Sequence, residues 1–274
     1  MMGAVVSFSL MAISGRVTST ELDTFELMTY RSAIGVIIVG AIAVYSGAWR
    51  HISTRYLGLH IARNAFHFAG QNLWFYALPL IPLAQLFAFE FTLPIWVVIL
   101  AALFLGERIT VLKLIMIALG FAGVLLIARP EIGAISSGTV AAALCAIGFA
   151  MTAIITRRLT QVEKIITILF YLTLIQLLFG LAIAGADGSI AVPSIGITPF
   201  VLIVGICGLT AHYSLTRALS IAPASVAMPF DYIRLPVIAI VGYLYYDEPL
   251  DLFTIFGAAM IIGANYLNLL SGRK

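Results

Sequence analysis

The sequence predicts an all-α integral membrane protein in which ten transmembrane helices form two inverted repeats of five helices each. Three observations support this fold class. Only 10% of the 274 residues are charged and 62% are hydrophobic, whereas a typical soluble domain has about 25% charged residues. The hydrophobic residues form continuous runs of about 20 residues, the length of a helix that crosses a bilayer. The two halves of the chain also share one residue pattern, which recurs at a constant offset.

Ten apolar runs take up nearly the whole chain and leave no room for a soluble domain. They lie at roughly residues 3–19, 25–48, 57–77, 82–105, 110–128, 137–156, 165–184, 196–219, 223–246 and 251–271. The first run has no basic segment before it and no small-residue cleavage site, so we expect it to be the first helix and not a signal peptide. The function is therefore expected to depend on side chains inside the helix bundle or at its mouth.

The internal repeat is clearest between residues 78–108 and 219–249. Three pairs of residues of like type share an offset of 141: Pro82 and Pro223 (223 − 82), Glu90 and Asp231 (231 − 90), and Glu107 and Glu248 (248 − 107). A repeat of about half the chain in a membrane protein is typical of transporters whose binding site lies between the two units. We therefore predict one repeat in residues 1–130 and the other in residues 131–274.

The positions of the basic residues predict the orientation of the helices. Arginine and lysine gather in alternate loops and at the C-terminus, as with Arg50 and Arg55 after the second run and Arg157 and Arg158 at the sixth. Because short cytoplasmic loops collect these residues, we expect both termini in the cytoplasm of a bacterial-type inner or plasma membrane. Five is an odd number, so the second repeat is expected to enter the membrane upside down relative to the first.

Polar side chains form a stripe on the third predicted helix, at spacings of 4, 3, 4 and 3: His60, Asn64, His67, Gln71 and Trp74. Such spacing places them on one helix face, and this face is expected to point inward, away from lipid. In the eighth helix, His212 and Tyr213 match Gln71 and Asn72 at the same offset of 141. We take Asn64, His67, Gln71, Trp74, His212 and Tyr213 as candidate substrate-binding residues; core histidines bonded to backbone carbonyls are the alternative for His67 and His212.

Charged residues inside the apolar runs form a second group of candidates, because one charge near the bilayer centre costs about 2.5–3.5 kcal/mol. Asp231 and Arg234 are three residues apart and are expected to form an ion pair. Glu90 has no cation nearby on its own helix, so it is protonated, solvated or paired across helices with Arg31, Arg63 or Arg234. We predict that Glu90, Asp231 and Arg234 form a coupling or charge network. A purely structural contact between helices is the alternative.

An aromatic ring stands next to the acid in both repeats, at Phe89 beside Glu90 and at Phe230 beside Asp231. This arrangement suits a zwitterion or a planar molecule in an apolar pocket with few polar anchors, so these four residues complete the candidate binding set. Bundle packing is the alternative. Glu107 and Glu248 precede the fifth and tenth helices, where an acid stabilises the helix N-terminus, and are expected to be structural.

Other function classes fit the sequence less well. An intramembrane enzyme needs a nucleophile with a base or a metal cluster, and a channel needs a continuous polar path; neither pattern occurs in the sequence. No cofactor, metal or nucleic-acid partner is expected. The expected partners are a small-molecule substrate and the lipid bilayer, and the protein is expected to be a monomer.

Several segments in both halves of the sequence resemble a known family. The segments ALPLIPLAQ, LPIWVVILAALFLGERIT and IALGFAGVLLI, and their partners RALSIAPASVAMPFDY, GYLYYDEPL and GAAMIIGANYL, resemble the two EamA-type repeats of the drug/metabolite transporter superfamily, as does ELMTYRSAIGVII with Arg31. The resemblance implies a ten-helix exporter that works by alternating access, with a central cavity between helices 3, 4, 8 and 9. It also implies export of amino acids, aromatic ones included; related branches carry riboflavin, S-adenosylmethionine, nucleotide sugars or toxic cations.

Overall fold

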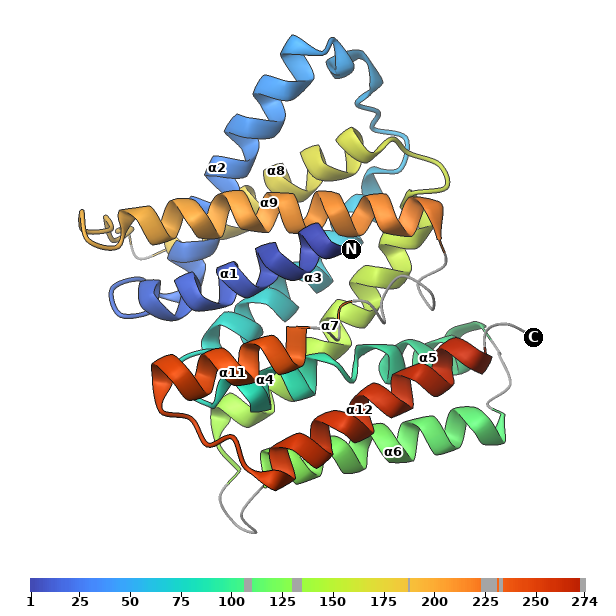
Figure 1. Cartoon of the computed structure of the whole chain (residues 1–274). Coiled ribbons are helices and arrows are strands. Elements are labelled where there is room, and N and C mark those ends of the chain that lie inside the picture. The colour runs from blue at the N-terminus through green and yellow to red at the C-terminus, as the bar shows by residue number, and fades with distance from the viewer. Residues whose placement is uncertain (106–109, 130–134, 187, 223–230, 232–233, 272–274) are drawn as a thin grey trace.

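The computed structural model describes residues 1–105, 110–129, 135–186, 188–222, 231 and 234–271, which fold into helices without strands. The elements are α1 (Met2–Thr18), α2 (Thr24–Tyr45), the short 3-10 helix η1 (Ala48–His51), α3 (Leu57–Ala77), α4 (Leu83–Glu90), α5 (Leu93–Leu105), α6 (Val111–Ala128), α7 (Ser137–Leu159), α8 (Ile165–Ala184), α9 (Thr198–Ile221), α11 (Arg234–Tyr246) and α12 (Leu252–Ser271) (Figure 1).

Many of these helices are suited to a membrane. Among the described residues, six stretches are long and apolar enough to cross a bilayer: Thr24–Tyr45, Leu83–Leu100, Val111–Ala128, Ser137–Leu159, Ile165–Ala184 and Thr198–Ile221. Three apolar helices are shorter, at Met2–Thr18, Arg234–Tyr246 and Leu252–Leu267. Helix α3 has 21 residues, but its polar stripe lowers its hydropathy. The predicted all-helical membrane fold is therefore confirmed in this coarse form.

The fourth apolar run is interrupted, although the sequence was expected to form one helix over 82–105. Helix α4 ends at Glu90 and α5 begins at Leu93. The cause is Pro94, which cannot donate a hydrogen bond to the carbonyl of Glu90 and disfavours helical geometry at the residue before it. The last turn tightens instead, with Thr92 N donating to Phe89 O at 3.0 Å. As a result, Glu90 stands at the free end of a half-helix inside the bundle.

Helices in the two halves of the chain begin at the offset found in the sequence. A difference of 141 joins four pairs of helix starts: Thr24 and Ile165, Leu57 and Thr198, Leu93 and Arg234, Val111 and Leu252 (165 − 24, 198 − 57, 234 − 93, 252 − 111). The largest contacts are between α6 and α12, α3 and α7, α1 and α9, and α2 and α8; Figure 1 shows α6 and α12 side by side. At this offset, α1 corresponds to α7, α2 to α8, α3 to α9 and α6 to α12. When each helix is replaced by its counterpart in the other half, the same four contacting pairs are obtained.

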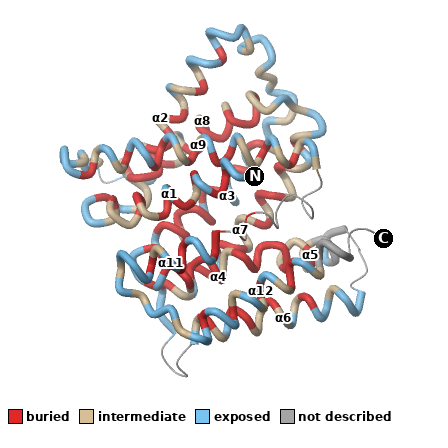
Figure 2. Tube along the Cα trace, viewed as in Figure 1, coloured by how far each residue is buried: buried red, intermediate tan, exposed pale blue. Residues whose placement is uncertain are grey.

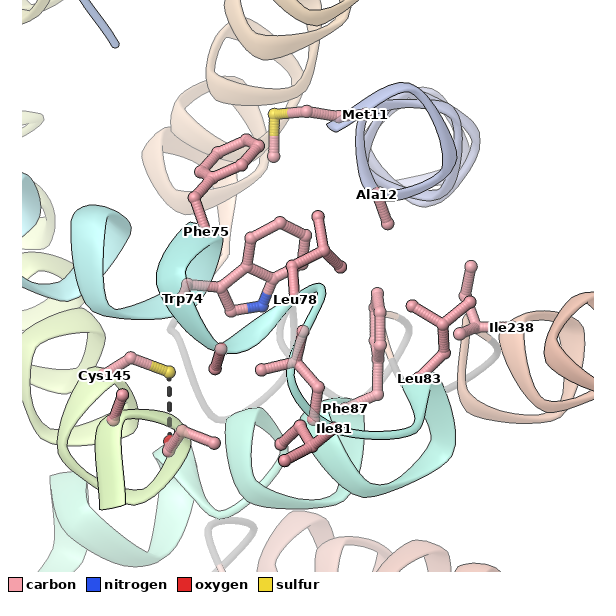
Figure 3. Packing of buried hydrophobic residues seen from close by; sticks show 14 of the residues in the cluster. Met11, Ala12, Trp74, Phe75, Leu78, Ile81, Leu83, Phe87, Cys145 and Ile238 are labelled. Carbon is pink, nitrogen blue, oxygen red and sulfur yellow. Dashed lines mark hydrogen bonds between the residues drawn. The ribbon is translucent and has the colours of Figure 1, made fainter. Parts of the chain in front are cut away.

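The core lies where α1, α3, α4, α7 and α11 meet. Figure 2 shows buried residues along these helices, and exposed residues on the far end of α2 and on the outer faces. In Figure 3, Met11 of α1 lies close to Phe75 of α3, and Leu83 of α4 faces Ile238 of α11; these residues belong to one buried apolar cluster. The half-helix α4 is thus held by apolar packing on several sides, which fixes the position of Glu90 at its end.

Gly123 and Gly257 bring α6 and α12 into backbone contact. A Cβ added at Gly123 would lie 2.7 Å from the carbonyl oxygen of Gly257. Because this neighbour is backbone, Gly123→Val is expected to push the helices apart and to lower the free energy of unfolding by about 1–3 kcal/mol. The measurement is unfolding of the purified protein in detergent. Gly40→Val is the matched control, since no atom of the described residues lies within 4 Å of a Cβ at Gly40. Equal losses in the two variants would contradict this packing.

Candidate functional site

A cavity with an empty volume of about 740 Å³ opens between α1, α3, α7, α9 and the ends of α4, α5 and α11. Its walls combine aromatic rings with buried polar groups. The rings are Phe8, Trp74, Phe75 and Phe149; the polar and charged residues are Arg63, His67, Gln71, Glu90, Thr152, Thr156, His212, Thr216, Asp231 and Arg234. A largely apolar cavity with a few convergent polar groups is the usual form of a small-molecule site.

Arg234 lies between two acids at one end of the cavity, which we call the acidic end (Glu90, Asp231 and Arg234). Its Nε donates to Asp231 Oδ1 at 2.8 Å, and its Nη2 donates to Glu90 Oε1 at 2.7 Å and also contacts Asp231 Oδ2. The guanidinium also faces the rings of Phe8, Phe87 and Phe91, at 4.7, 5.2 and 5.4 Å from their centroids, which favours the cation. The predicted Asp231–Arg234 pair is present.

Glu90 has two partners among the residues that the structure describes. Besides Arg234, the indole Nε1 of Trp74 donates to Glu90 Oε2 at 2.8 Å. Of the three arginines considered from the sequence, Arg234 is therefore the one that pairs with Glu90. Two carboxylates and one guanidinium give the acidic end a net charge of −1. Charged groups at the ends of interrupted helices near the middle of a membrane are typical of transporter binding sites.

Two further arginines lie toward the other end of the cavity, which we call the basic end (Arg31 and Arg63). Arg63 lines the cavity, and its Nε donates to Thr156 Oγ1 at 2.7 Å. Arg31 stands behind it, donating through Nη1 to Gln71 Oε1 at 3.2 Å. Gly208 of α9 makes room for Arg31, since a Cβ there would lie 2.9 Å from Arg31 Cζ. Charge of both signs is thus present in one cavity.

His67 and His212 stand between the two ends. Their ring centroids are 4.6 Å apart and their planes are nearly perpendicular. Both nitrogens of His67 and Nδ1 of His212 are buried and have no hydrogen-bond partner among the described residues. Because buried polar atoms are nearly always satisfied, these atoms indicate a place where a bound molecule donates or accepts. The alternative for His67 was a core histidine that donates to a backbone carbonyl, and among the described residues His67 makes no such hydrogen bond.

Comparison with known proteins assigns the chain to a family. Residues 1–129 and 136–270 match the EamA-like transporter family. The chain belongs to this family. It is therefore a transporter of the drug/metabolite transporter superfamily, as the resemblance implied, and the expectation that it is not an enzyme is confirmed.

Several relatives of this EamA-family transporter have small-molecule substrates in their names. A riboflavin transporter of Brucella anthropi is 31% identical over 90% of this chain and 88% of its own. An S-adenosylmethionine uptake transporter of Rickettsia bellii is 27% identical over 99% and 92%. The pseudopaline exporter CntI of Pseudomonas aeruginosa is 27% identical over 95% and 91%. None of these names is that of an amino-acid exporter.

A solved crystal structure shares the fold of the EamA-family chain. It aligns with a TM-score of 0.73 over 99% of this chain and 96% of the other, at 17% sequence identity. At that identity the likeness concerns the fold alone. Within the described part of the transporter, no group of three His, Cys, Asp or Glu side chains could hold a metal ion.

The structure brings most of the predicted site residues of the transporter to the cavity, but not all of them. His67, Gln71, Trp74, Glu90, His212, Asp231 and Arg234 line it. Asn64 is buried outside it and donates to the carbonyl oxygens of His60 and Tyr171 at 2.8 and 3.3 Å. Phe89 is half-buried and does not line it, and Tyr213 is 50% exposed. Phe230 lies outside the described residues.

The phase of the helices explains these differences. Tyr213 follows His212 directly, and neighbouring helical residues point about 100° apart, so both cannot face the cavity. The polar stripe on α3 does not face the cavity along its whole length. His60 and Asn64 pack against α8 instead, and the rings of His60 and Tyr171 are 4.4 Å apart. The cavity also includes Phe8, Phe149 and Thr156, which lie in apolar or small-residue runs and give no sequence signal. Arg63 could have been found, since it lies four residues before His67 on the same stripe.

Arg16 and Glu248 form a second ion pair, outside the cavity. Glu248 Oε2 accepts a hydrogen bond from Leu83 N, the first residue of α4, at 2.7 Å, and Arg16 Nη2 donates to Ile81 O at 2.8 Å. The sequence predicted that Glu248 stabilises the start of the following helix; the amide it binds belongs to α4, in the other half of the chain. This group of contacts, the Arg16–Glu248 lock, joins α1, α4 and the loop after α11. Glu107 lies outside the described residues.

Proposed function

We propose that this chain is a secondary transporter that moves a ring-bearing metabolite across the bacterial plasma membrane by alternating access. The observation that carries the proposal is the cavity itself, in which four aromatic rings and buried charges of both signs face one volume. Planar ring systems bind between aromatic walls, and polar groups fix their orientation. Riboflavin and S-adenosylmethionine, named in the relatives, are of this kind. Another metabolite is thus favoured over the amino acids expected from the sequence.

We also propose that ten helices form two inverted repeats, in residues 1–130 and 131–274. The common offset of the helix starts and the exchange symmetry of the helix pairs support this. Helix α4 ends at Glu90, and α5 and α11 begin at the equivalent residues Leu93 and Arg234. The break between α4 and α5 fits the broken helices of inverted-repeat transporters. The shorter apolar helices α1, α11 and α12 count among the ten.

With both termini in the cytoplasm, the cavity opens toward the cytoplasm. Thr156 and Leu219, which line it, lie near the ends of α7 and α9 that precede cytoplasmic loops in this orientation. The Arg16–Glu248 lock lies at the opposite ends of the helices and closes that side. The structure is then the inward-facing state of the alternating-access cycle, with the two repeats rocking around Glu90 and Asp231.

Transport by purified protein in liposomes tests the proposal. Radiolabelled riboflavin, S-adenosylmethionine and an aromatic amino acid are supplied separately, and initial rates are measured against concentration. We expect saturable flux of riboflavin or S-adenosylmethionine, and none in liposomes without protein. Saturable flux of the amino acid alone would support amino-acid transport, the function expected from the sequence. Linear flux of all three compounds, unchanged by adding excess unlabelled compound, would contradict a transporter with one binding cavity.

A further inference from the structure

Two buried guanidinium groups have no acidic partner within the described part of the chain. Arg63 is 1% exposed and Arg31 is 5% exposed, and a guanidinium keeps its charge in proteins. The ion pairs of the described residues involve Arg16, Arg129 and Arg234 instead. The partners of Arg63 and Arg31 are neutral oxygens of Thr156, Asn64 and Gln71, and Nε of Arg31 has no partner in the part of the chain that the structure describes. Such charges inside a membrane protein usually mark a substrate pathway.

The basic end lies well apart from the acidic end. Arg63 and Trp74 are eleven residues apart on α3 (74 − 63), or about 16 Å along the helix at about 1.5 Å per residue. Trp74 contacts Glu90, so α3 spans the cavity from one charged end to the other. A metabolite lying along this wall reaches both ends, with its ring system beside the aromatic residues between them.

The histidines supply an independent sign of a ligand. His67 is 3% exposed and His212 is 4% exposed, and both line the cavity with ring nitrogens that have no partner in the described ranges. At the basic end, Arg31 and Arg63 are both buried and together carry a charge of +2, and the partners that the structure describes for them are neutral oxygens. An anionic group on the ligand compensates part of this local charge.

We infer that Arg63, with Arg31 behind it, forms an anion subsite, and that the transported metabolite binds there through a carboxylate or phosphate group. The inference deepens the proposed function, on which it rests, by assigning a charge to the ligand in that cavity. A guanidinium donates charge-assisted hydrogen bonds to either group. S-adenosylmethionine carries a carboxylate with cationic groups that suit the acidic end. Riboflavin has no anionic group at neutral pH, so the subsite favours a ligand such as S-adenosylmethionine over riboflavin.

Matched pairs of ligands test the subsite on the full-length protein in detergent. Calorimetric titration compares S-adenosylmethionine with its decarboxylated analogue, and flavin mononucleotide with riboflavin, so the two pairs separate carboxylate from phosphate. We expect the anionic member of at least one pair to bind the wild type about 10- to 100-fold more tightly. In Arg63→Gln this ratio falls to about threefold or less, whereas Arg63→Lys retains most of it.

Arg158→Gln is the control, because it removes the same charge from an exposed position near the end of α7; the ratio should stay at the wild-type value. Equal binding of both members of each pair by the wild type, or an unchanged ratio in Arg63→Gln, overturns the subsite and leaves the proposed function standing. Binding of none of the four compounds overturns the ligand class of the proposed function. The subsite is then decided by thermal unfolding in sodium phosphate against sodium chloride at matched ionic strength: phosphate should raise the midpoint of the wild type but not of Arg63→Gln, and no difference overturns it.

Discussion

Arg234→Met is expected to lower the free energy of unfolding by about 3–5 kcal/mol and to abolish transport. The substitution leaves the carboxylates of Glu90 and Asp231 facing each other without a cation, and their side chains are only 12% and 10% exposed. A buried charge that loses its partner keeps the full penalty of desolvation. The measurements are unfolding in detergent and flux in liposomes.

A neutralised variant separates stability from function. Combining Arg234→Met with Glu90→Gln and Asp231→Asn removes all three charges, so most of the lost stability should return, while transport stays absent because the cavity has lost its acidic end. Arg129→Met is the matched control: its ion pair with Asp251 lies at the surface, with side chains 47% and 36% exposed, where such pairs contribute about 1 kcal/mol or less. An Arg234→Met variant as stable as Arg129→Met would contradict the buried network.

The charge network could be predicted only where its members are close in the sequence. Asp231 and Arg234 are three residues apart, and that spacing alone indicates a pair. For Glu90, the sequence left three arginines as possible partners, because the actual partner depends on which helices cross at the end of α4. The structure selects Arg234 through the packing of α4 against α11. Long-range pairing of this kind has no signature in local spacing.

Repetition in the sequence proved more informative than polarity about the placement of helices. Glu90 and Asp231, paired by the offset of 141, lie in one cluster, and the helix starts follow the same offset. Polarity alone does not distinguish Asn64, which donates to backbone carbonyls of α3 and α8 and does not line the cavity. Periodicity places a residue on a helix face, but neighbouring helices then divide that face between packing and cavity.

The partners of the two arginines at the basic end could not be predicted from the sequence. From the sequence, Arg31 and Arg63 were possible partners for Glu90, alongside Arg234. In the structure their partners are neutral oxygens of Gln71, Thr156 and Asn64. Glu90 instead accepts hydrogen bonds from Arg234 and Trp74. The same observation leaves two cations for a ligand to compensate.

Glu248→Ala is expected to open the side of the protein that the Arg16–Glu248 lock closes. The substitution removes the ion pair with Arg16 and the acceptor for Leu83 N at the start of α4. Each charge-assisted hydrogen bond contributes about 1.5–3 kcal/mol, so the open population should rise roughly tenfold or more. The reporter is Ile81→Cys, a position only 5% exposed, in a background where Cys145 and Cys207 are replaced by serine; the rate of labelling by a water-soluble maleimide in membranes is measured.

The lock predicts a specific pattern across variants, because its charge and its hydrogen bond to α4 can be separated. Glu248→Gln keeps an oxygen acceptor for Leu83 N but loses the ion pair, so its labelling rate should fall between those of the wild type and Glu248→Ala. Asp251→Asn changes an acid in the same loop whose partner is the exposed Arg129, and it should label like the wild type. If Ile81→Cys reacts at the wild-type rate in Glu248→Ala, the contact joins the helices without controlling access. A rise confined to conditions that unfold the protein would lead to the same conclusion, since alternating access requires the folded repeats to move as intact units.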